Sequence, residues 1–241
     1  TTGLQNTIIG ALAGDAITDA DGNVAVGYGA LTTNTVGSRS VAIGRDALSS
    51  QNPATATDML NVAVGEDAGH LISTGIQNTI VGGLAGDAIT TGSYNIAIGT
   101  NGGGGVTTGS QNILIGQGTG MAALTGDQNT VVGDSAGGAL TSGVRNTVMG
   151  ASAGAALTTG IRNVAVGVQA LLVDTQGSRS VAVGHNALSG QNFTTATDSY
   201  NTALGHEAGA AVTTAVRNTL VGGLSGDALT TGARNTTLGY A

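Results

Sequence analysis

The sequence predicts an all-β fold, a parallel β-solenoid of about 14 coils. Three observations predict it. A five-residue string (Asn, or Ser in two copies, then a β-branched residue, any residue, an aliphatic residue and Gly) recurs fourteen times. Successive copies have a spacing of 17 except at two places where the spacing is 21, and 43 of the 241 residues are glycine. Repetition at a fixed short period is typical of solenoids. The copies begin at Asn6, Asn23, Ser40, Asn61, Asn78, Asn95, Asn112, Asn129, Asn146, Asn163, Ser180, Asn201, Asn218 and Asn235.

Each copy predicts one short strand and one corner. With the Asn as register 1, register 2 is β-branched in every copy, register 4 is a large aliphatic residue (Met149 once), and register 5 is Gly. β-Branched residues favour extended backbone, and an invariant Gly after them marks a turn. Coils that stack at about 4.8 Å bring equal registers together. The Asn side chains are therefore expected to form an amide ladder along the stack.

Each coil is expected to place one aliphatic side chain in its interior, either from register 9 or from register 12. Nine copies have Gly at register 9 and an apolar residue at register 12, such as Ile72 or Ala123, whereas four have Leu at register 9 and a polar residue at register 12. A tightly packed interior with one place per coil explains this exchange. The four Leu and polar pairs are Leu31 and Asn34, Leu48 and Gln51, Leu171 and Asp174, and Leu188 and Gln191.

Composition excludes several classes of function. Cysteine is absent, which excludes a disulfide framework, and the net charge of −7 with few basic residues argues against nucleic-acid binding. No apolar run reaches the ~18 residues of a membrane span, so membrane insertion is not expected. No nucleophile set, carboxylate pair or nucleotide motif appears, so no enzymatic activity and no cofactor is predicted. His185 and His206 share register 6 of adjacent coils and are expected to be exposed, without a metal site.

Register 3 indicates that the chain assembles with copies of itself. This register is apolar in every copy except Thr237, and it points to the opposite side of the strand from register 4. A single thin coil covers only one side of its strand, so the other side is expected to meet a neighbouring chain, most simply in a homotrimer. The alternative is that small apolar side chains simply tolerate exposure.

A longer repeat organises the whole chain. Residues 1–101 align with residues 141–241, an offset of 140, so the duplicated unit is eight coils. We expect a single solenoid domain over residues 1–241. Both ends fall inside coils without a polar cap, which predicts a segment of a longer fibre or an end-to-end filament.

The two 21-residue coils carry the candidate contact residues for a receptor. Each adds four residues at the same place, over 51–60 and 191–200, and insertions in solenoids map to loops that often bind partners. The alternatives are a tolerated surface insertion or a device that fixes the register of assembled chains. The candidates are Pro53, Thr55, Thr57, Asp58, Phe193, Thr195, Thr197, Asp198 and Tyr200.

A column of basic residues forms a second candidate surface. Six of the seven arginines occupy register 17, immediately before the repeated string: Arg39, Arg145, Arg162, Arg179, Arg217 and Arg234. This polar stripe could contact an acidic glycan or a partner chain. The alternative is that the side chains lie along apolar surface with their polar tips in water.

The strings Ser40–Gly44 and Asn23–Gly27 resemble the head repeats of trimeric autotransporter adhesins, and the full coil over 78–94 is similar to repeats of phage and bacterial tail-fibre proteins. The resemblance covers the whole chain. It implies a left-handed parallel β-roll, usually trimeric, in an extracellular fibre on a cell surface or virion. The adhesin heads use shorter coils than those of this chain.

Together these features predict a structural or adhesive fibre segment that presents surface-binding loops to a glycan or protein receptor. Two competing functions stay open. One is a self-assembling filament or spacer without a ligand. The other is an ice-binding solenoid, because Thr pairs recur at registers 13 and 14, for example Thr90–Thr91 and Thr158–Thr159.

Overall fold

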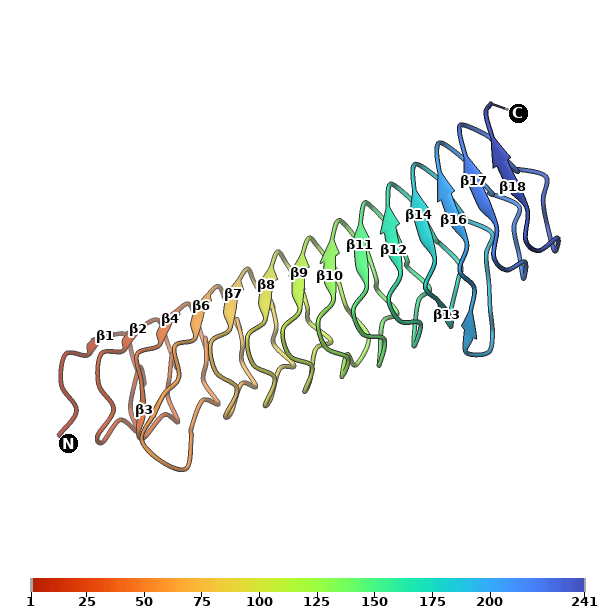
Figure 1. Cartoon of the computed structure of the whole chain (residues 1–241). Helices are drawn as coiled ribbons and strands as arrows, with labels where there is room; N and C mark the ends of the chain where they lie inside the picture. The colour runs from red at the N-terminus through yellow and green to blue at the C-terminus, as the bar shows by residue number, and fades with distance from the viewer. Residues whose placement is uncertain (1, 241) are drawn as a thin grey trace. The chain divides into compact units, whose positions relative to one another are not determined.

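The chain consists of short parallel strands joined by tight turns. The computed structural model describes residues 2–240, and within that range it contains no helix, hence none that could cross a membrane. The chain divides into two compact units, one ending at Thr125 and the other beginning at Gly126. Each unit is a stack of coils that follow the spacing of the repeated string, which confirms the predicted β-solenoid fold (Figure 1).

The first unit contains one strand from each of seven coils. These strands pair in parallel with the strand of the next coil, and two shorter strands, β3 (Gly37–Ser38) and β5 (Thr57–Asp58), form a separate pair at the first 21-residue coil. The seven are β1 (Thr7–Ile9), β2 (Val24–Val26), β4 (Val41–Ile43), β6 (Val62–Val64), β7 (Thr79–Val81), β8 (Ile96–Ile98) and β9 (Ile113–Ile115).

The second unit repeats this arrangement. Its short strands β13 (Gly177–Ser178) and β15 (Thr197–Asp198) pair at the second 21-residue coil. Its seven ladder strands are β10 (Thr130–Val132), β11 (Thr147–Met149), β12 (Val164–Val166), β14 (Val181–Val183), β16 (Thr202–Leu204), β17 (Thr219–Val221) and β18 (Thr236–Leu238).

Equal registers stack on one another, as the repeat predicts. Ala25 of β2 pairs with Ala42 of β4, and this continues across the longer coil, where Ala42 pairs with Ala63. The Asn ladder is confirmed as well. The backbone amide of Asn95 donates to Oδ1 of Asn78 at 2.9 Å, and its side-chain Nδ2 donates to the same oxygen at 3.2 Å and to the carbonyl of Gly109 at 2.9 Å.

Positive φ angles at four registers make each coil turn. The register 5 glycines have φ between +119° and +143°, a region that side chains rarely adopt, and registers 7, 9 and 17 lie in the left-handed region. Register 9 includes the four leucines, for example Leu31 with φ of +53°. Burial of the leucine side chain offsets the cost of this backbone conformation, about 1–2 kcal/mol.

The core of each unit is a narrow column of side chains from registers 3, 8, 9 and 12. Register 3 side chains are buried in every coil except the first and the last, and all four register 9 leucines are fully buried. A Cβ built on Gly69 would lie 2.9 Å from Cδ1 of Ile72, so registers 9 and 12 compete for one space as expected. One assignment was wrong: Ala123 is not buried, and the adjacent Leu124 fills the core of its coil.

The outer side of each seven-stranded ladder is apolar. No residue at register 2 or register 4 is buried, although these registers hold only Thr, Val, Ile, Leu and Met. In the first unit Ile43 is 39% exposed, and in the second Met149 is 41% and Leu204 48% exposed. We call the register 2 and 4 columns of each unit its outer apolar face; the structure shows that register 3 is the covered side of the strand.

Candidate functional site: the two inserted coils

The four extra residues of each long coil form a loop that is anchored by a pair of short strands. In the first unit β5 returns beside β3, with Gly37 opposite Thr57 and Ser38 opposite Asp58. The second unit has the same register, with Gly177 opposite Thr197. In Figure 1 the first loop extends the corner of the coil between β4 and β6. The loops are thus short ordered extensions of the solenoid wall.

Most of the candidate contact residues lie at the loop surface. Thr55, Asp58, Thr195, Asp198 and Tyr200 are exposed. Two further candidates, Thr57 and Thr197, are partly buried, and their hydroxyls donate within the loop, to the carbonyl of Thr55 at 2.8 Å and to that of Thr195 at 3.0 Å. These contacts tie down each loop and leave the neighbouring hydroxyls and carboxylates accessible.

Pro53 and Phe193 are buried, so these two candidates are not available for contact at the loop surface. They occupy equivalent positions at the base of the two loops. A Cβ built on Gly37 would lie 3.0 Å from both Pro53 Cδ and Met59 Cγ, which shows that these side chains fill one space. In the second unit the larger Phe193 is accompanied by the smaller Ser199, so the summed volume is conserved.

A polar network lies under the first loop, where Ser40 replaces the ladder Asn. Oε1 of Gln51 accepts from Ser40 Oγ at 3.1 Å and from Asn61 Nδ2 at 2.9 Å, so the glutamine amide continues the ladder across the gap. Asn34 Nδ2 donates to the carbonyl of Gly37 at 2.7 Å, and Asn34 Oδ1 accepts from the backbone amide of Gly37 at 3.0 Å. Nε2 of Gln51 is buried without a hydrogen-bond partner among the described residues.

The second unit places a carboxylate in the same network. Gln191 donates from Nε2 to Asp174 Oδ2 at 2.6 Å and to Ser180 Oγ at 2.8 Å, and its Oε1 accepts from Asn201 at 2.8 Å. Asp174, which stands where the first unit has Asn34, also accepts from the amides of Gly177 and Phe193, each at 3.0 Å. Asp174 therefore accepts from Nε2 of Gln191, whereas the equivalent Nε2 of Gln51 in the first unit has no hydrogen-bond partner among the described residues.

Burial raises the pKa of the Asp174 carboxyl above its ordinary value of 3.8, and the hydrogen bonds that it accepts oppose this rise only in part. The contribution of Asp174 to folding is thus fully present below pH 3.8 and is lost as the pH rises through the raised pKa. Asp174→Asn removes this dependence. We expect the melting temperature of the variant relative to the parent to rise as the pH increases from below 3.8 through the raised pKa. Thermal unfolding followed by circular dichroism checks this, and a constant difference would contradict it.

Two of the six register 17 arginines form ion pairs with carboxylates of the inserted loops. All six arginines have φ between +57° and +62°; Arg39 lies in the first unit, and the other five occupy register 17 of coils in the second unit. Arg39 pairs with Asp58 at 2.7 Å, and Arg179 pairs with Asp198, the equivalent residues of the second unit. The guanidinium of Arg179 also lies 5.7 Å from the centre of the Tyr200 ring. Arg145 donates to Gln128 at 2.9 Å, and Arg162, Arg217 and Arg234 are exposed.

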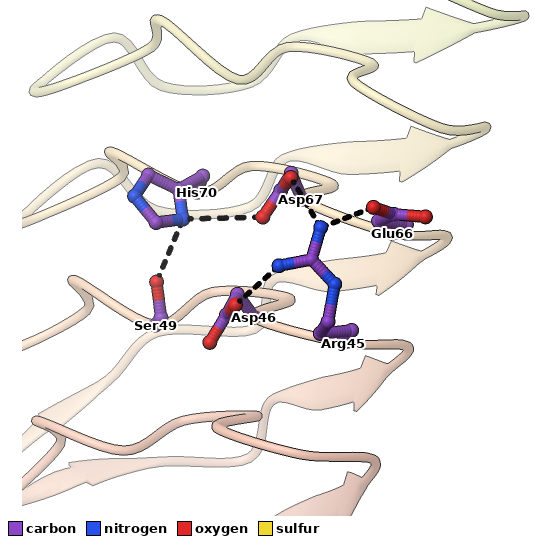
Figure 2. Close-up of polar contacts among 6 residues, drawn as sticks. All are labelled: Arg45, Asp46, Ser49, Glu66, Asp67 and His70. Atoms are coloured by element: carbon purple, nitrogen blue, oxygen red, sulfur yellow. Dashed lines mark hydrogen bonds and ion pairs between the residues drawn. The ribbon is translucent and has the colours of Figure 1, made fainter.

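The seventh arginine forms an ion cluster that the sequence patterns did not reveal (Figure 2). Arg45 contacts Asp46 at 3.0 Å, Asp67 at 3.4 Å and Glu66, and these carboxylates raise the pKa of the Arg45 guanidinium, with the Glu66 hydrogen bond as the main cause. His70 Nδ1 lies 2.9 Å from Ser49 Oγ and 3.6 Å from Asp67. In the sequence this cluster is indicated only by Glu66 and Asp67, which occupy registers 6 and 7 of the coil after that of Arg45.

The recurrent Thr pairs serve the stack itself at one of their two registers. The register 13 hydroxyls donate to the carbonyl of the next coil, for example Thr90 to Thr107 at 3.2 Å and Thr158 to Thr175 at 2.9 Å. The threonines at register 14, such as Thr91 and Thr159, are exposed. The register 13 hydroxyls therefore hold neighbouring coils together, and register 14 supplies the exposed Thr column.

Comparison of the chain with known protein families, with curated proteins and with solved structures gives no match.

Proposed function

We propose that the chain is a structural and adhesive segment of an extracellular fibre that assembles as a homo-oligomer, most simply a trimer. The observation that carries this proposal is the outer apolar face. In each unit it holds aliphatic side chains from all seven coils in register, and no element of that unit covers it. A regular apolar surface of this kind is typical of a surface that another chain covers. A second copy of the same chain presents columns with the same spacing.

The inserted loops are the proposed contact sites for a receptor on a cell surface or virion. Their exposed groups are hydroxyls, carboxylates and, in the second unit, the ring of Tyr200, which is 49% exposed beneath the guanidinium of Arg179. Hydroxyls and carboxylates hydrogen-bond polar ligands, and an exposed aromatic ring adds apolar area. This combination suits a glycan or the polar surface of a protein.

Loop variants of the full chain test the adhesive part of the proposal. The variants combine Thr55→Ala with Asp58→Asn and Thr195→Ala with Asp198→Asn. The control combines Thr74→Ala with Thr214→Ala, two exposed threonines outside the loops. Binding is measured on a glycan array and on intact cells. A loss confined to the loop variants supports an adhesin, whereas equal binding by all chains would favour a spacer without a ligand in the loops.

A further inference from the structure

We infer that the second unit binds a divalent transition-metal ion of the Zn²⁺ type through His185, His206 and Glu207. The three side chains come from adjacent coils: His185 follows β14 and its register 5 glycine, while His206 and Glu207 follow β16 and its glycine. One ligand atom of each lies within 4.8 Å of the others, and the two histidines are exposed while Glu207 is partly buried. These are the only three residues of this kind that converge in the described part of the chain.

The donor set selects the class of metal. Imidazole nitrogen suits Zn²⁺, Cu²⁺ and Ni²⁺, whereas Ca²⁺ and Mg²⁺ require oxygen ligands. Two histidines and one glutamate form a known zinc ligand set, which leaves a further position for water or for a group from another molecule. Nothing in the donor set would bind Ca²⁺ well, because it offers one carboxylate only.

The geometry requires only a small adjustment. The imidazole rings are stacked with their centres 5.1 Å apart and their planes at 10°, so the two rings lie face to face on adjacent coils. Nε2 of His206 lies 3.8 Å from the carboxylate of Glu207. Two atoms bound to one Zn²⁺ lie at most about 4.2 Å apart, twice a bond of about 2.1 Å. Exposed side chains reach this separation by changes within their rotamer wells.

The first unit supplies independent support, because it holds a cation at the same position. The offset of 140 aligns Arg45 with His185, Glu66 with His206 and Asp67 with Glu207. In the first unit the Arg45 guanidinium is held between the carboxylates of Glu66 and Asp67 (Figure 2). The second unit keeps one carboxylate but has imidazole side chains in place of the guanidinium and the other carboxylate. A bound metal ion would restore the cation that the first unit builds in.

Isothermal titration of the full chain, purified without a histidine tag, with Zn²⁺ tests the inference. We expect one ion per chain, no binding of Ca²⁺, and a Zn²⁺-dependent rise in melting temperature. His185→Ala and His206→Ala should each weaken binding by more than the ~10–100-fold that loss of an outer-shell partner costs. The matched control is His70→Ala, which removes the third histidine of the sequence.

A second variant separates metal binding from folding. The double substitution His185→Arg with His206→Glu introduces the residue pair of the first unit, and circular dichroism should show an unchanged fold with Zn²⁺ binding lost. Unaltered Zn²⁺ binding in this variant, a loss of binding in His70→Ala equal to that in His185→Ala, or the absence of saturable binding by the parent chain would each overturn the inference.

Discussion

Replacing Gly133 with alanine is expected to destabilise the second unit by about 4 kcal/mol, the sum of roughly 1–3 for a strained backbone and 1–3 for overpacking. Gly133 is the register 5 glycine after β10, with φ of +134°. A Cβ built there lies 2.6 Å from the carbonyl oxygen and 2.7 Å from the carbonyl carbon of Gly150. These are backbone atoms of the next coil, which cannot move without breaking the ladder.

Gly138→Ala provides the matched control in the same coil. Gly138 does not have a positive φ, and the nearest atom to a built Cβ is the carbonyl oxygen of Ser135 at 3.6 Å. Chemical denaturation of both variants should show a large loss of stability for Gly133→Ala and a change within about 0.5 kcal/mol for Gly138→Ala. Similar stabilities would show that the register 5 corner does not constrain the coil.

Gln191→Leu is expected to cost about 3 kcal/mol, because it removes a hydrogen-bond donor from the buried Asp174 carboxyl and leaves other buried polar groups without a partner. The amide of Gln191 holds the Asp174 carboxylate, Ser180 and Asn201 together beneath the second loop. Leucine has a volume similar to that of glutamine, so the loss of stability reports mainly the lost hydrogen bonds and not a change in packing. Denaturation of the full chain measures it.

The first unit supplies the comparison for this prediction. Gln51→Leu removes two hydrogen bonds to Oε1 but also removes an Nε2 group that has no partner among the residues described, and no carboxylate lies in this network. Its expected cost is about 1 kcal/mol. Equal costs for the two variants would mean that the Asp174 carboxylate is not held by Gln191.

The repeat predicted the backbone because every coil has the same strand and the same corner at the same registers. An invariant Gly at register 5 and a β-branched residue at register 2 admit one corner and one strand, and the exchange between registers 9 and 12 marked the shared core. Ala123 was misassigned because its coil departs from the common register, and the bridge between Val106 and Leu124 brings Leu124 into the core instead.

The sites were less predictable, because they depend on contacts between residues of different coils. Gln51 and Gln191 were recognised as polar partners of the register 9 leucines, but their role in bridging the Asn ladder at Ser40 and Ser180 follows only from the three-dimensional positions of their amides. Pro53 and Phe193 were named as contact residues because they lie in the inserted segments, whereas their burial depends on the volumes of Met59 and Ser199 beneath the loops. Glu207 follows His206 directly in the sequence, but its convergence with His185 requires the stacking of two coils.

The native mass of the chain tests the role of the outer apolar face most directly. Sedimentation equilibrium of the full chain should give an integral multiple of 23.1 kDa, three chains in the simplest case. Val166→Glu together with Val183→Glu, which charges register 4 in adjacent coils of the second unit, should lower that mass while circular dichroism stays unchanged. A parent chain that sediments at 23.1 kDa at every concentration would contradict assembly through this face.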